Sequence, residues 1–332
     1  MSQPNAPPTF SVIIPTRDRA DLFERSLKSV LAQDIDDLEA IVVNDGSHES
    51  QHQRYQALEQ AYAGRVSFHH LVRRRKGHGP AYARNHGASH ARGRYLCFLD
   101  DDDLWTDSAH LRRCRDAIAA LGAPLDLYLT DQRAMFEDGR QHPGPLWLSG
   151  MDQQVAAKAD AHGNRRVTLH DLLRADGFAH LNCSIYRRGL FDSIGGLDET
   201  LRYEEDRDIY LRAIDTAEHM LYNPAVIAQH HIPGPGGVDN ASVVANRIEK
   251  KLFQLRICDK AITSARQAAT RDFGRRTKGH TLRHIAQTLR SDGRNPEALL
   301  YMREALTVAF SFGWFAFTAL CTVQALLAPR RT

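Results

Sequence analysis

Short apolar runs alternate with helix-like stretches over the first 130 residues of this 332-residue chain, and no other feature restricts its fold as strongly. The runs are Phe10–Ile14, Leu38–Val43, Val66–Leu71, Tyr95–Leu99 and Leu125–Leu129. Helical patterns separate them and begin near Arg19, Glu49, Pro80 and Asp107. Short buried strands joined by helices of this length form right-handed β-α-β units. We therefore predict an α/β fold with a mainly parallel, Rossmann-like sheet.

Polar residues follow three of these predicted strands. They are the segments PTRDR at 15–19, NDGS at 44–47 and DDDD at 100–103. Ligands of open parallel sheets bind beyond the carboxyl ends of the strands. The sequence therefore predicts a site at this edge, lined by acidic and polar side chains.

Proline and glycine residues at 233–237 interrupt the chain and divide its pattern into two parts. Before them, residues 131–166 lack periodicity and predict a long loop, which is either a functional segment or a plain surface insertion. After them, the sequence is helical in character to the end. We predict one domain over residues 1–235 and a helical tail over residues 236–332.

The tail is basic and amphipathic at its start and apolar at its end. Residues 247–294 hold 13 Lys and Arg against 4 Asp and Glu, although the net charge of the whole chain is only +3. Residues 305–329 contain no charged residue; that length suffices to cross a bilayer, but the polar residues within it suit a packed hairpin or an interfacial helix equally well. We expect contact with an anionic membrane surface through residues 247–331, with a solvated helical face as the alternative. The small net charge argues against nucleic acid as a partner.

Cysteine usage and the N-terminus indicate the compartment. The five cysteines are scattered and have no CxxC spacing, which argues against a disulfide framework and a structural zinc site. The first ten residues lack the basic-then-apolar plan of a signal peptide. We expect a cytoplasmic protein, peripheral at the inner face of the cell membrane.

The four consecutive aspartates Asp100–Asp103 are difficult to explain as structural residues. Like charges this close repel and raise one another's pKa unless a cation lies among them. A divalent cation such as Mg²⁺ or Mn²⁺ is the natural occupant and brings substrate phosphates with it. The alternative is an acidic helix cap, which needs one Asp and not four.

Three further clusters carry weaker signals. The acidic residues 204–208 open a predicted helix, where a carboxylate can act as a general base, although acids in a first helical turn are also common without function. Arg73–Lys76 lead into the glycine-containing turn at 77–80, which suits a diphosphate or forms a solvated basic loop. His230 and His231 follow an apolar run and are candidates for metal or phosphate contact, or have a structural role.

A series of motifs in this order carries a family resemblance. They are Phe10–Arg19 (FSVIIPTRDR), Val43–Ser47 (VNDGS), Ala83–Asn85 (ARN), Phe98–Asp103 (FLDDDD) and Glu205–Asp208 (EDRD). Over about residues 8–235 the chain resembles glycosyltransferase family 2. The resemblance implies the GT-A fold of nucleotide-diphospho-sugar transferases, with a C-terminal helical extension.

Residue roles follow from this resemblance. It implies a donor-binding site formed by Pro15, Thr16, Arg17, Asp45, Arg84, Asp100 and Asp101. In it, Asp45 would face the nucleotide base. The DxD match implies that Mn²⁺ or Mg²⁺ is bound by Asp100 and Asp102, with His231 as a further candidate ligand. Asp206 would be the catalytic base and Glu205 its neighbour.

The sequence departs from the family pattern at two points. The run of four aspartates leaves the DxD register open, because Asp101 and Asp103 have the same spacing. The Gln-x-x-Arg-Trp motif of processive synthases does not follow, so single-sugar transfer is expected. We predict metal-dependent, inverting transfer from a nucleoside-diphospho-sugar, with a UDP-sugar expected, to a hydroxyl of a saccharide or lipid-linked acceptor. The alternatives are a nucleotidyltransferase of the same fold and an inactive sugar-nucleotide-binding subunit.

Overall fold

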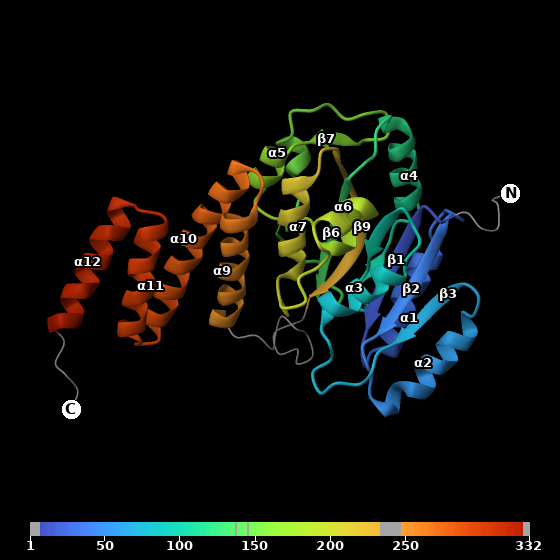
Figure 1. Ribbon diagram of the computed structural model, residues 1–332, viewed down its shortest axis with the longest axis horizontal. Coiled ribbons are helices and arrows are strands. Elements are labelled where there is room, and N and C mark those ends of the chain that lie inside the picture. Colours follow the sequence, from blue (N-terminus) through green and yellow to red (C-terminus); the bar gives the residue numbers. More distant parts are fainter. Residues whose placement is uncertain (1–6, 137, 145, 233–246, 328–332) are drawn as a thin grey trace. The chain divides into compact units, whose positions relative to one another are not determined.

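The computed structural model describes residues 7–136, 138–144, 146–232 and 247–327. The chain divides into two compact units, residues 1–237 and 238–332, each with its own core (Figure 1). The domain boundary expected at residue 235 lies outside the described residues.

The N-terminal unit is built on one nine-stranded sheet. Its strands are β1 (Phe10–Thr16), β2 (Leu38–Asn44), β3 (Val66–His70), β4 (Tyr95–Phe98), β5 (Leu104–Trp105), β6 (Leu127–Phe136), β7 (Arg165–Val167), β8 (Ser184–Arg187) and β9 (Met220–Ile232). They lie in the order β3-β2-β1-β4-β8-β6-β9-β5, and β7 also pairs with β9. The first four strands pair in parallel, as does β6 with β9, whereas β8, β5 and β7 are antiparallel to their neighbours. The prediction of an α/β fold with a mostly parallel central sheet is confirmed.

Helices cover both faces of this sheet (Figure 1). α1 (Ala20–Leu31), α2 (Glu49–Ala61) and α4 (His110–Leu121) supply buried apolar side chains to the core on one face. α3 (Pro80–His90) packs on the other face, against β1 and β2, together with α6 (Arg188–Ser193), whose Phe191 contacts Phe98. This layering encloses the apolar strands and leaves their carboxyl ends for the site.

Gly87 allows α3 to lie close to the sheet. A Cβ atom at this position would lie 2.5 Å from Ile13 Cγ2 and 3.2 Å from Val43 Cγ2. Any larger residue would therefore push the helix away from β1 and β2. The close packing fixes the position of Arg84, one turn earlier on the same helix.

The segment expected as a loop over residues 131–166 is partly regular. β6 continues to Phe136, and β7 begins at Arg165, so the prediction was too long at both ends. The strand extends because residues 131–136 pair with β9, which lies about ninety residues later in the chain. The remaining elements of the unit are the short helices η1 (Met151–Gln153), α5 (Leu169–Arg174) and η2 (Leu181–Cys183) and the helix α7 (Glu205–Thr216).

The C-terminal unit consists of helices in the part of the chain that the structure describes. They are α9 (Arg247–Ser264), α10 (Ala268–Ser291), α11 (Asn295–Val308) and α12 (Phe312–Leu327). Its core lies between α10, α11 and α12 and includes Leu282, Ile285, Met302 and Trp314. The apolar segment is therefore split between two helices, and no helix among residues 247–327 combines the length and the apolar character needed to cross a membrane.

Candidate active site

The acidic turn Asp100–Asp103 lies at the carboxyl edge of the parallel strands. Leu99 N donates to Ile13 O at 3.1 Å and so continues the pairing of β4 with β1 up to the turn. Asp103 N donates to Asp100 O at 3.1 Å and closes the turn. Because β1 and β2 end beside it, at Thr16 and Asn44, this turn shares its edge with the segments that follow them.

Arg84 joins the two acidic clusters. Its Nη1 donates to Glu205 Oε1 at 2.8 Å and its Nη2 to Asp100 Oδ1 at 2.5 Å. The guanidinium is buried, and burial opposes its charge, but the two carboxylates raise the pKa of Arg84 above its usual value. Burial likewise opposes ionisation of Asp100, yet Arg84 holds the pKa of Asp100 below its usual value. Helix α3 thus connects the start of α7 to the end of β4 through one cation.

Asp101 and Asp102 share Arg19. Its Nη1 lies 2.8 Å from Asp102 Oδ2 and 3.4 Å from Asp101 Oδ1. Burial and the charge of Asp102 raise the pKa of Asp101 to about 7, and burial and Asp103 raise the pKa of Asp102 to about 6. One arginine therefore does not compensate both carboxylates, and this end of the turn favours an additional positive charge.

Asp103 is fully buried and binds three groups. Its carboxylate accepts hydrogen bonds from Asn182 Nδ2, from His230 Nδ1 at 2.6 Å and from His231 N at 2.7 Å. Burial opposes the charges of Asp103 and His230, but their attraction lowers the pKa of Asp103 and raises the pKa of His230 to about 9. Asp103 therefore holds the His230 ring in place through this hydrogen bond.

Four side chains around this pair offer ligand atoms within 4.8 Å of one another: Asp100, Asp103, His180 and His230. We call these four residues the aspartate–histidine group. His180 Nε2 also lies 3.7 Å from Asp206 Oδ2, so the group reaches the start of α7. Burial and the proximity of His230 lower the pKa of His180 to about 4, which leaves its imidazole neutral at pH 7.

Asp206 stands apart from the other acids of α7. Glu204 binds Arg207, Glu205 binds Arg84 and Asp208 binds Arg212. Within the described residues no Arg or Lys lies within 4.0 Å of the Asp206 carboxylate, whose Oδ1 accepts only the Arg207 backbone N–H, at 2.8 Å. Burial and the charge of Glu204 raise the pKa of Asp206 to about 6. This carboxylate is free to accept a proton.

A second part of the edge is formed by the segments after β1 and β2. Asp45 is buried and accepts hydrogen bonds from His78 Nδ1 at 2.7 Å and from the backbone N–H of Gly79 at 3.1 Å. Thr16 Oγ1 lies 2.7 Å from the hydroxyl of Tyr55. The bonds from Asp45 hold the turn before α3 against the sheet.

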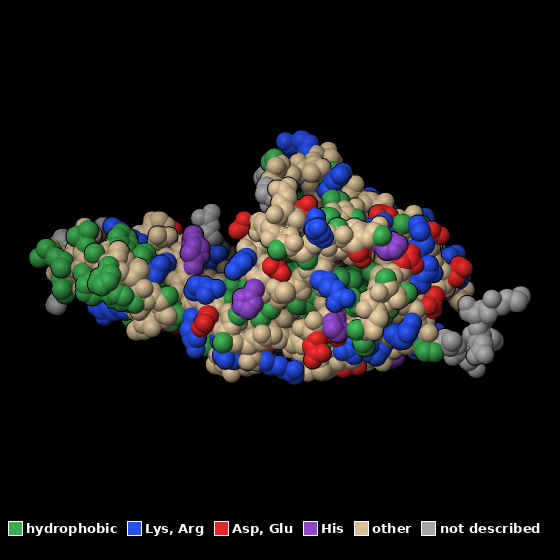
Figure 2. Space-filling model, turned by 90° about the horizontal axis from the view of Figure 1, so that it is seen from above, with side chains coloured by type: hydrophobic (Ala, Val, Ile, Leu, Met, Phe, Trp, Pro, Cys, Tyr) green, Lys and Arg blue, Asp and Glu red, His purple; other side chains and the backbone are tan. Residues whose placement is uncertain are grey.

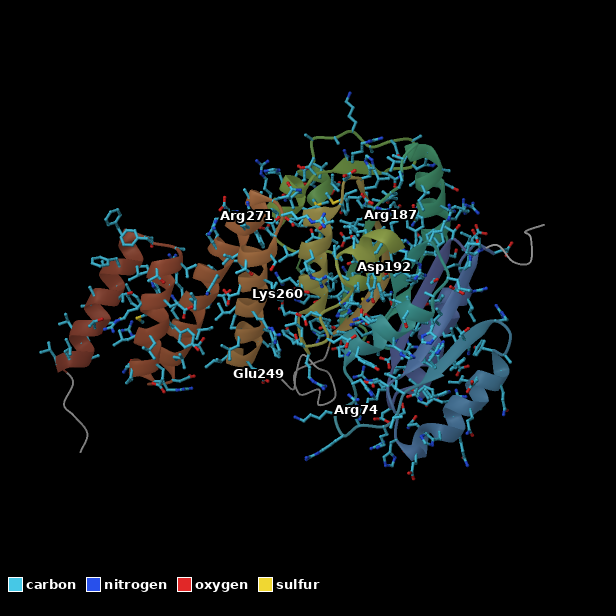
Figure 3. The ribbon with its side chains drawn as sticks, in the orientation of Figure 1. Arg74, Arg187, Asp192, Glu249, Lys260 and Arg271 are labelled. Atoms are coloured by element: carbon cyan, nitrogen blue, oxygen red, sulfur yellow. The ribbon has the colours of Figure 1, made fainter. Side chains whose placement is uncertain are left out.

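Arg17 closes this part of the edge. Its Nη2 donates to the carbonyl oxygens of Arg74 and Arg75, at 3.0 and 3.3 Å, in the loop that leads into α3 (Arg74 is labelled in Figure 3). Gly77, in the same loop, has φ of +66°, and a Cβ atom there would lie 2.1 Å from Arg17 Nη1 and 2.4 Å from Asp45 Oδ2. The positive φ favours glycine at this position, and a larger residue would displace the ends of both side chains.

The structure brings most of the predicted residues to one edge and places one of the three predicted metal ligands, Asp100, in the aspartate–histidine group. Asp102 instead contacts Arg19. His231 contributes its backbone N–H to Asp103, and its Nδ1 lies 3.7 Å from that carboxylate, while His230 is the imidazole within the group. Nothing in the sequence favours His230 over His231. The two side chains differ because successive residues of β9 point to opposite faces of the sheet.

Two residues of the site were missed. Asn182 lies on η2 and His180 directly before it, where no motif marks them. Asn182 forms hydrogen bonds with Asp100 and Asp103, and His180 Nε2 lies 3.9 Å from Asp100 Oδ2. Pro15 and Asp101, which were predicted for donor binding, lie at the same edge, Pro15 half-buried at the end of β1. The roles assigned to the individual residues remain predictions.

Comparison with known proteins identifies the fold. Two similar solved structures are Staphylococcus aureus TarS residues 1–349 in complex with UDP-GlcNAc (TM-score 0.64, 19% identity, covering 90% of this chain and 81% of that one) and the mannosyltransferase PcManGT of Pyrobaculum calidifontis in complex with GDP-Man and Mn²⁺ (TM-score 0.55, 17% identity, covering 99% and 83%). Both likenesses establish the fold alone, in agreement with the expected GT-A architecture.

Comparison of sequences identifies the family. The uncharacterized glycosyltransferase EpsJ of Bacillus subtilis is 28% identical over 218 residues, which are 64% of this chain and 58% of EpsJ. The GalNAc(5)-diNAcBac-PP-undecaprenol beta-1,3-glucosyltransferase of Campylobacter jejuni is 36% identical over 96 residues, 29% of this chain and 30% of that enzyme. The chain spans less than two thirds of the length of these relatives. The sequence model of glycosyl transferase family 2 matches residues 11–195, more than half of the chain, and the chain therefore belongs to that family.

Proposed function

We propose that this protein transfers one sugar from a nucleoside-diphospho-sugar to a hydroxyl of an acceptor, with inversion at the anomeric carbon. The observation that carries the proposal is Asp206, a partly buried carboxylate beside the aspartate–histidine group that has no Arg or Lys partner among the described residues. A general base needs such an unpaired carboxylate, with a pKa near the working pH.

The donor would bind along the carboxyl edge. Asp45 would face the base, with Pro15 and Thr16 beside it and Arg17 near the diphosphate. The UDP and UDP-GlcNAc complexes of TarS support a UDP-sugar as donor for this chain. Arg84 would act by holding Asp100 and Glu205 in place, since both ends of its guanidinium bind these carboxylates.

The chemistry of the aspartate–histidine group fits a divalent metal ion. Its two carboxylates supply the oxygen ligands that Mg²⁺ and Mn²⁺ prefer, and its two imidazoles supply nitrogen ligands that Mg²⁺ rarely takes. Mn²⁺, which is bound in the PcManGT complex with GDP-Man, is therefore the expected ion. When bound, the ion would stabilise negative charge on the leaving diphosphate.

The chemical step is a single displacement. The acceptor hydroxyl gives its proton to the Asp206 carboxylate while its oxygen forms a bond to the anomeric carbon. The bond from that carbon to the diphosphate oxygen breaks, and the nucleoside diphosphate leaves with the electron pair. Attack from the face opposite the leaving group inverts the anomeric configuration. Glu205 remains bound to Arg84 and fixes the start of α7.

The acceptor would be a saccharide or a lipid-linked saccharide, as the undecaprenol-linked substrate in the name of the Campylobacter relative supports.

The C-terminal unit would then contact an anionic membrane surface. Figure 2 shows hydrophobic side chains gathered over the end of this unit where α12 lies, and Phe312, Leu326 and Leu327 are each at least 78% exposed. Basic residues such as Lys260 on α9 and Arg271 on α10 (Figure 3) supply positive charge for acidic headgroups. Flotation with anionic vesicles should carry the protein upward, and Phe312→Ser with Leu326→Ser should abolish this; equal flotation with neutral vesicles would contradict the role of charge.

The test of the proposed function is a panel of UDP- and GDP-sugars incubated with the protein, with and without Mn²⁺. Slow release of a nucleoside diphosphate from one donor, dependent on Mn²⁺, is the expected result. Release of pyrophosphate would instead identify a nucleotidyltransferase. Tight nucleotide binding without any turnover, even when candidate acceptors are added, would identify an inactive binding subunit.

A further inference from the structure

Three histidines form a separate cluster between the edge strand β3 and helix α3. His69 lies on β3, and His86 and His90 lie one turn apart on α3. Their ring centroids are 4.2 Å (His69–His90), 4.6 Å (His86–His90) and 5.6 Å (His69–His86) apart. One nitrogen from each ring lies within 4.8 Å of the others.

The fold itself brings these rings together. His69 pairs in register with Val43, and parallel neighbours in register point to the same face of a sheet. Val43 is also the side chain that Gly87 of α3 approaches, so this face of β2 and β3 lies beneath the helix. His86 and His90 are spaced i, i+4 and therefore share the side of α3 that overlies His69.

The ring nitrogens of the cluster are available. In the described part of the chain no hydrogen bond reaches a ring nitrogen of His69 or His86, and only Nδ1 of His90 is engaged, with His86 O at 2.9 Å and Ser89 Oγ at 3.2 Å. The neighbouring His70 differs, since its Nε2 lies 3.0 Å from Glu59 Oε2. Burial, followed by the charges of the nearby histidines, lowers the pKa of His69 and of His86. Neither ring has a carboxylate partner within the described structure.

We propose that His69, His86 and His90 bind a zinc-type divalent transition-metal ion, with water completing a tetrahedral shell. Neutral imidazole is a preferred ligand of Zn²⁺, whereas Mg²⁺ and Mn²⁺ favour oxygen, so a nitrogen-only set selects a different ion from the aspartate–histidine group. Zn–N bonds of about 2.0–2.1 Å bring nitrogens to about 3.4 Å from one another. The observed nitrogens lie within 4.8 Å of one another, and binding would rotate rings that are half-buried or exposed.

Such an ion would tie the edge strand to the helix that carries Arg84. A series of stacked rings runs from the cluster to the N-terminal end of α3. Tyr82 stacks on His86, with ring centroids 6.3 Å apart, and on His78, with centroids 4.8 Å apart. His78 in turn binds Asp45. The ion would therefore stabilise α3 from its C-terminal end, without contact with the reacting groups.

The test uses the full chain without a polyhistidine tag, titrated with Zn²⁺ by calorimetry and with Co²⁺ by visible absorption. The variants are His86→Gln and the exposed His90→Gln, and the matched control is His70→Gln. Loss of a residue that hydrogen-bonds a metal ligand weakens metal binding by about 10–100-fold. Loss of a ligand itself should therefore weaken Zn²⁺ binding by about 100-fold or more. Wild type and His70→Gln should bind one ion more than His86→Gln and His90→Gln, and should alone show the visible bands of tetrahedral Co²⁺ at this site.

Two further readouts keep the result interpretable. Mn²⁺-dependent nucleotide binding should be the same in all four proteins, which shows that each is folded and that the aspartate–histidine group is intact. Zn²⁺ should raise the melting temperature of wild type more than that of His86→Gln. Equal stoichiometry and affinity for Zn²⁺ in wild type and both ligand variants would overturn the proposal, as would a wild-type protein with neither a Co²⁺ band nor a Zn²⁺-dependent rise in melting temperature.

Discussion

The aspartate turn, Asp100–Asp103, and the acidic start of α7, Glu204–Asp208, have similar compositions but different charge balance. In the turn, Arg84 and His230 lower the pKa of Asp100 and Asp103, while Asp101 and Asp102 share one arginine and have raised pKa values. At the start of α7 each acid except Asp206 pairs with an arginine, and the partner of Glu205 is the Arg84 that also binds Asp100.

This difference in charge balance suggests a different role for each cluster. The turn carries more negative charge than its cations compensate, which suits a metal ion and the diphosphate that accompanies it. At the start of α7 only the partly buried carboxylate of Asp206 lacks an arginine partner among the described residues, which suits proton transfer. Arg84 binds one acid from each cluster and fixes the position of one relative to the other.

The largest effect is expected for Asp206→Asn. The amide cannot accept the acceptor proton, so the turnover rate should fall by about 10³-fold, the middle of the range for a lost general base. The matched control is Asp208→Asn, two residues later in the same helix, whose carboxylate binds Arg212. Turnover of Asp206→Asn within tenfold of the control would show that the proton goes elsewhere.

Arg84→Gln should break the link between the clusters and destabilise the fold. It leaves the partly buried Asp100 and the buried Glu205 without their cation, and removing the buried partner of such an ion pair costs about 3 kcal/mol or more of unfolding free energy. Denaturant unfolding measures the loss. Arg113→Gln, whose partner Asp107 is partly exposed, should lose less; an equal loss in both would contradict a central role for Arg84.

The next effect shows whether Asp102 or Asp103 of the aspartate turn is the metal ligand. Asp103→Asn should weaken Mn²⁺ binding by about 100-fold, because it removes a ligand of the aspartate–histidine group and the anion that holds His230. Asp102→Asn, which removes a carboxylate bound to Arg19, should weaken it by less than about tenfold. Electron paramagnetic resonance of free Mn²⁺ during titration gives both affinities, and the reverse order would support the sequence-derived assignment of Asp102 as a metal ligand.

The smallest effect concerns a buried histidine outside both clusters. His110 is fully buried, neither of its ring nitrogens has a hydrogen-bond partner in the described structure, and burial lowers its pKa from 6.5 to about 3. The unfolded chain therefore binds a proton that the folded chain does not, and stability falls as the pH drops from about 6.5 toward 3. The loss should be about 2 kcal/mol between pH 7 and pH 5.

His110→Leu should remove this part of the pH dependence. Unfolding curves of both proteins at pH 7 and pH 5 test this. The part of the pH dependence that remains in His110→Leu is then due to other groups, including the two acidic clusters. An unchanged pH dependence in His110→Leu would show that His110 is not the group responsible.

The first half of the sheet could be predicted from the sequence, and the second half only in part. Parallel strands β1, β2 and β4 are buried on both faces over most of their length, so each appears as an apolar run. The edge strand β3 is partly exposed, and its run is interrupted by polar residues. β6 extends through residues 131–136 without such a run, because its pairing partner β9 lies far along the chain and supplies the hydrogen bonds. A local pattern does not record a contact of that range.

The site shows the same division. The acids at 100–103 and 205–206 stand out as charge clusters beside predicted element ends, and the structure brings them together through Arg84. The identity of the imidazoles depends on which face of β9 each presents, and on the short helix η2 beside which His180 lies. Neither is encoded in a local motif.

The most direct test of the division between the clusters is a calorimetric titration of UDP into the protein in the presence of Mn²⁺, repeated for Asp206→Asn and Asp103→Asn. If α7 supplies the base and the turn supplies the metal site, Asp206→Asn binds UDP with wild-type affinity, and Asp103→Asn loses the Mn²⁺-dependent part of that affinity. Loss of Mn²⁺-dependent binding in Asp206→Asn, with binding retained in Asp103→Asn, would contradict this division.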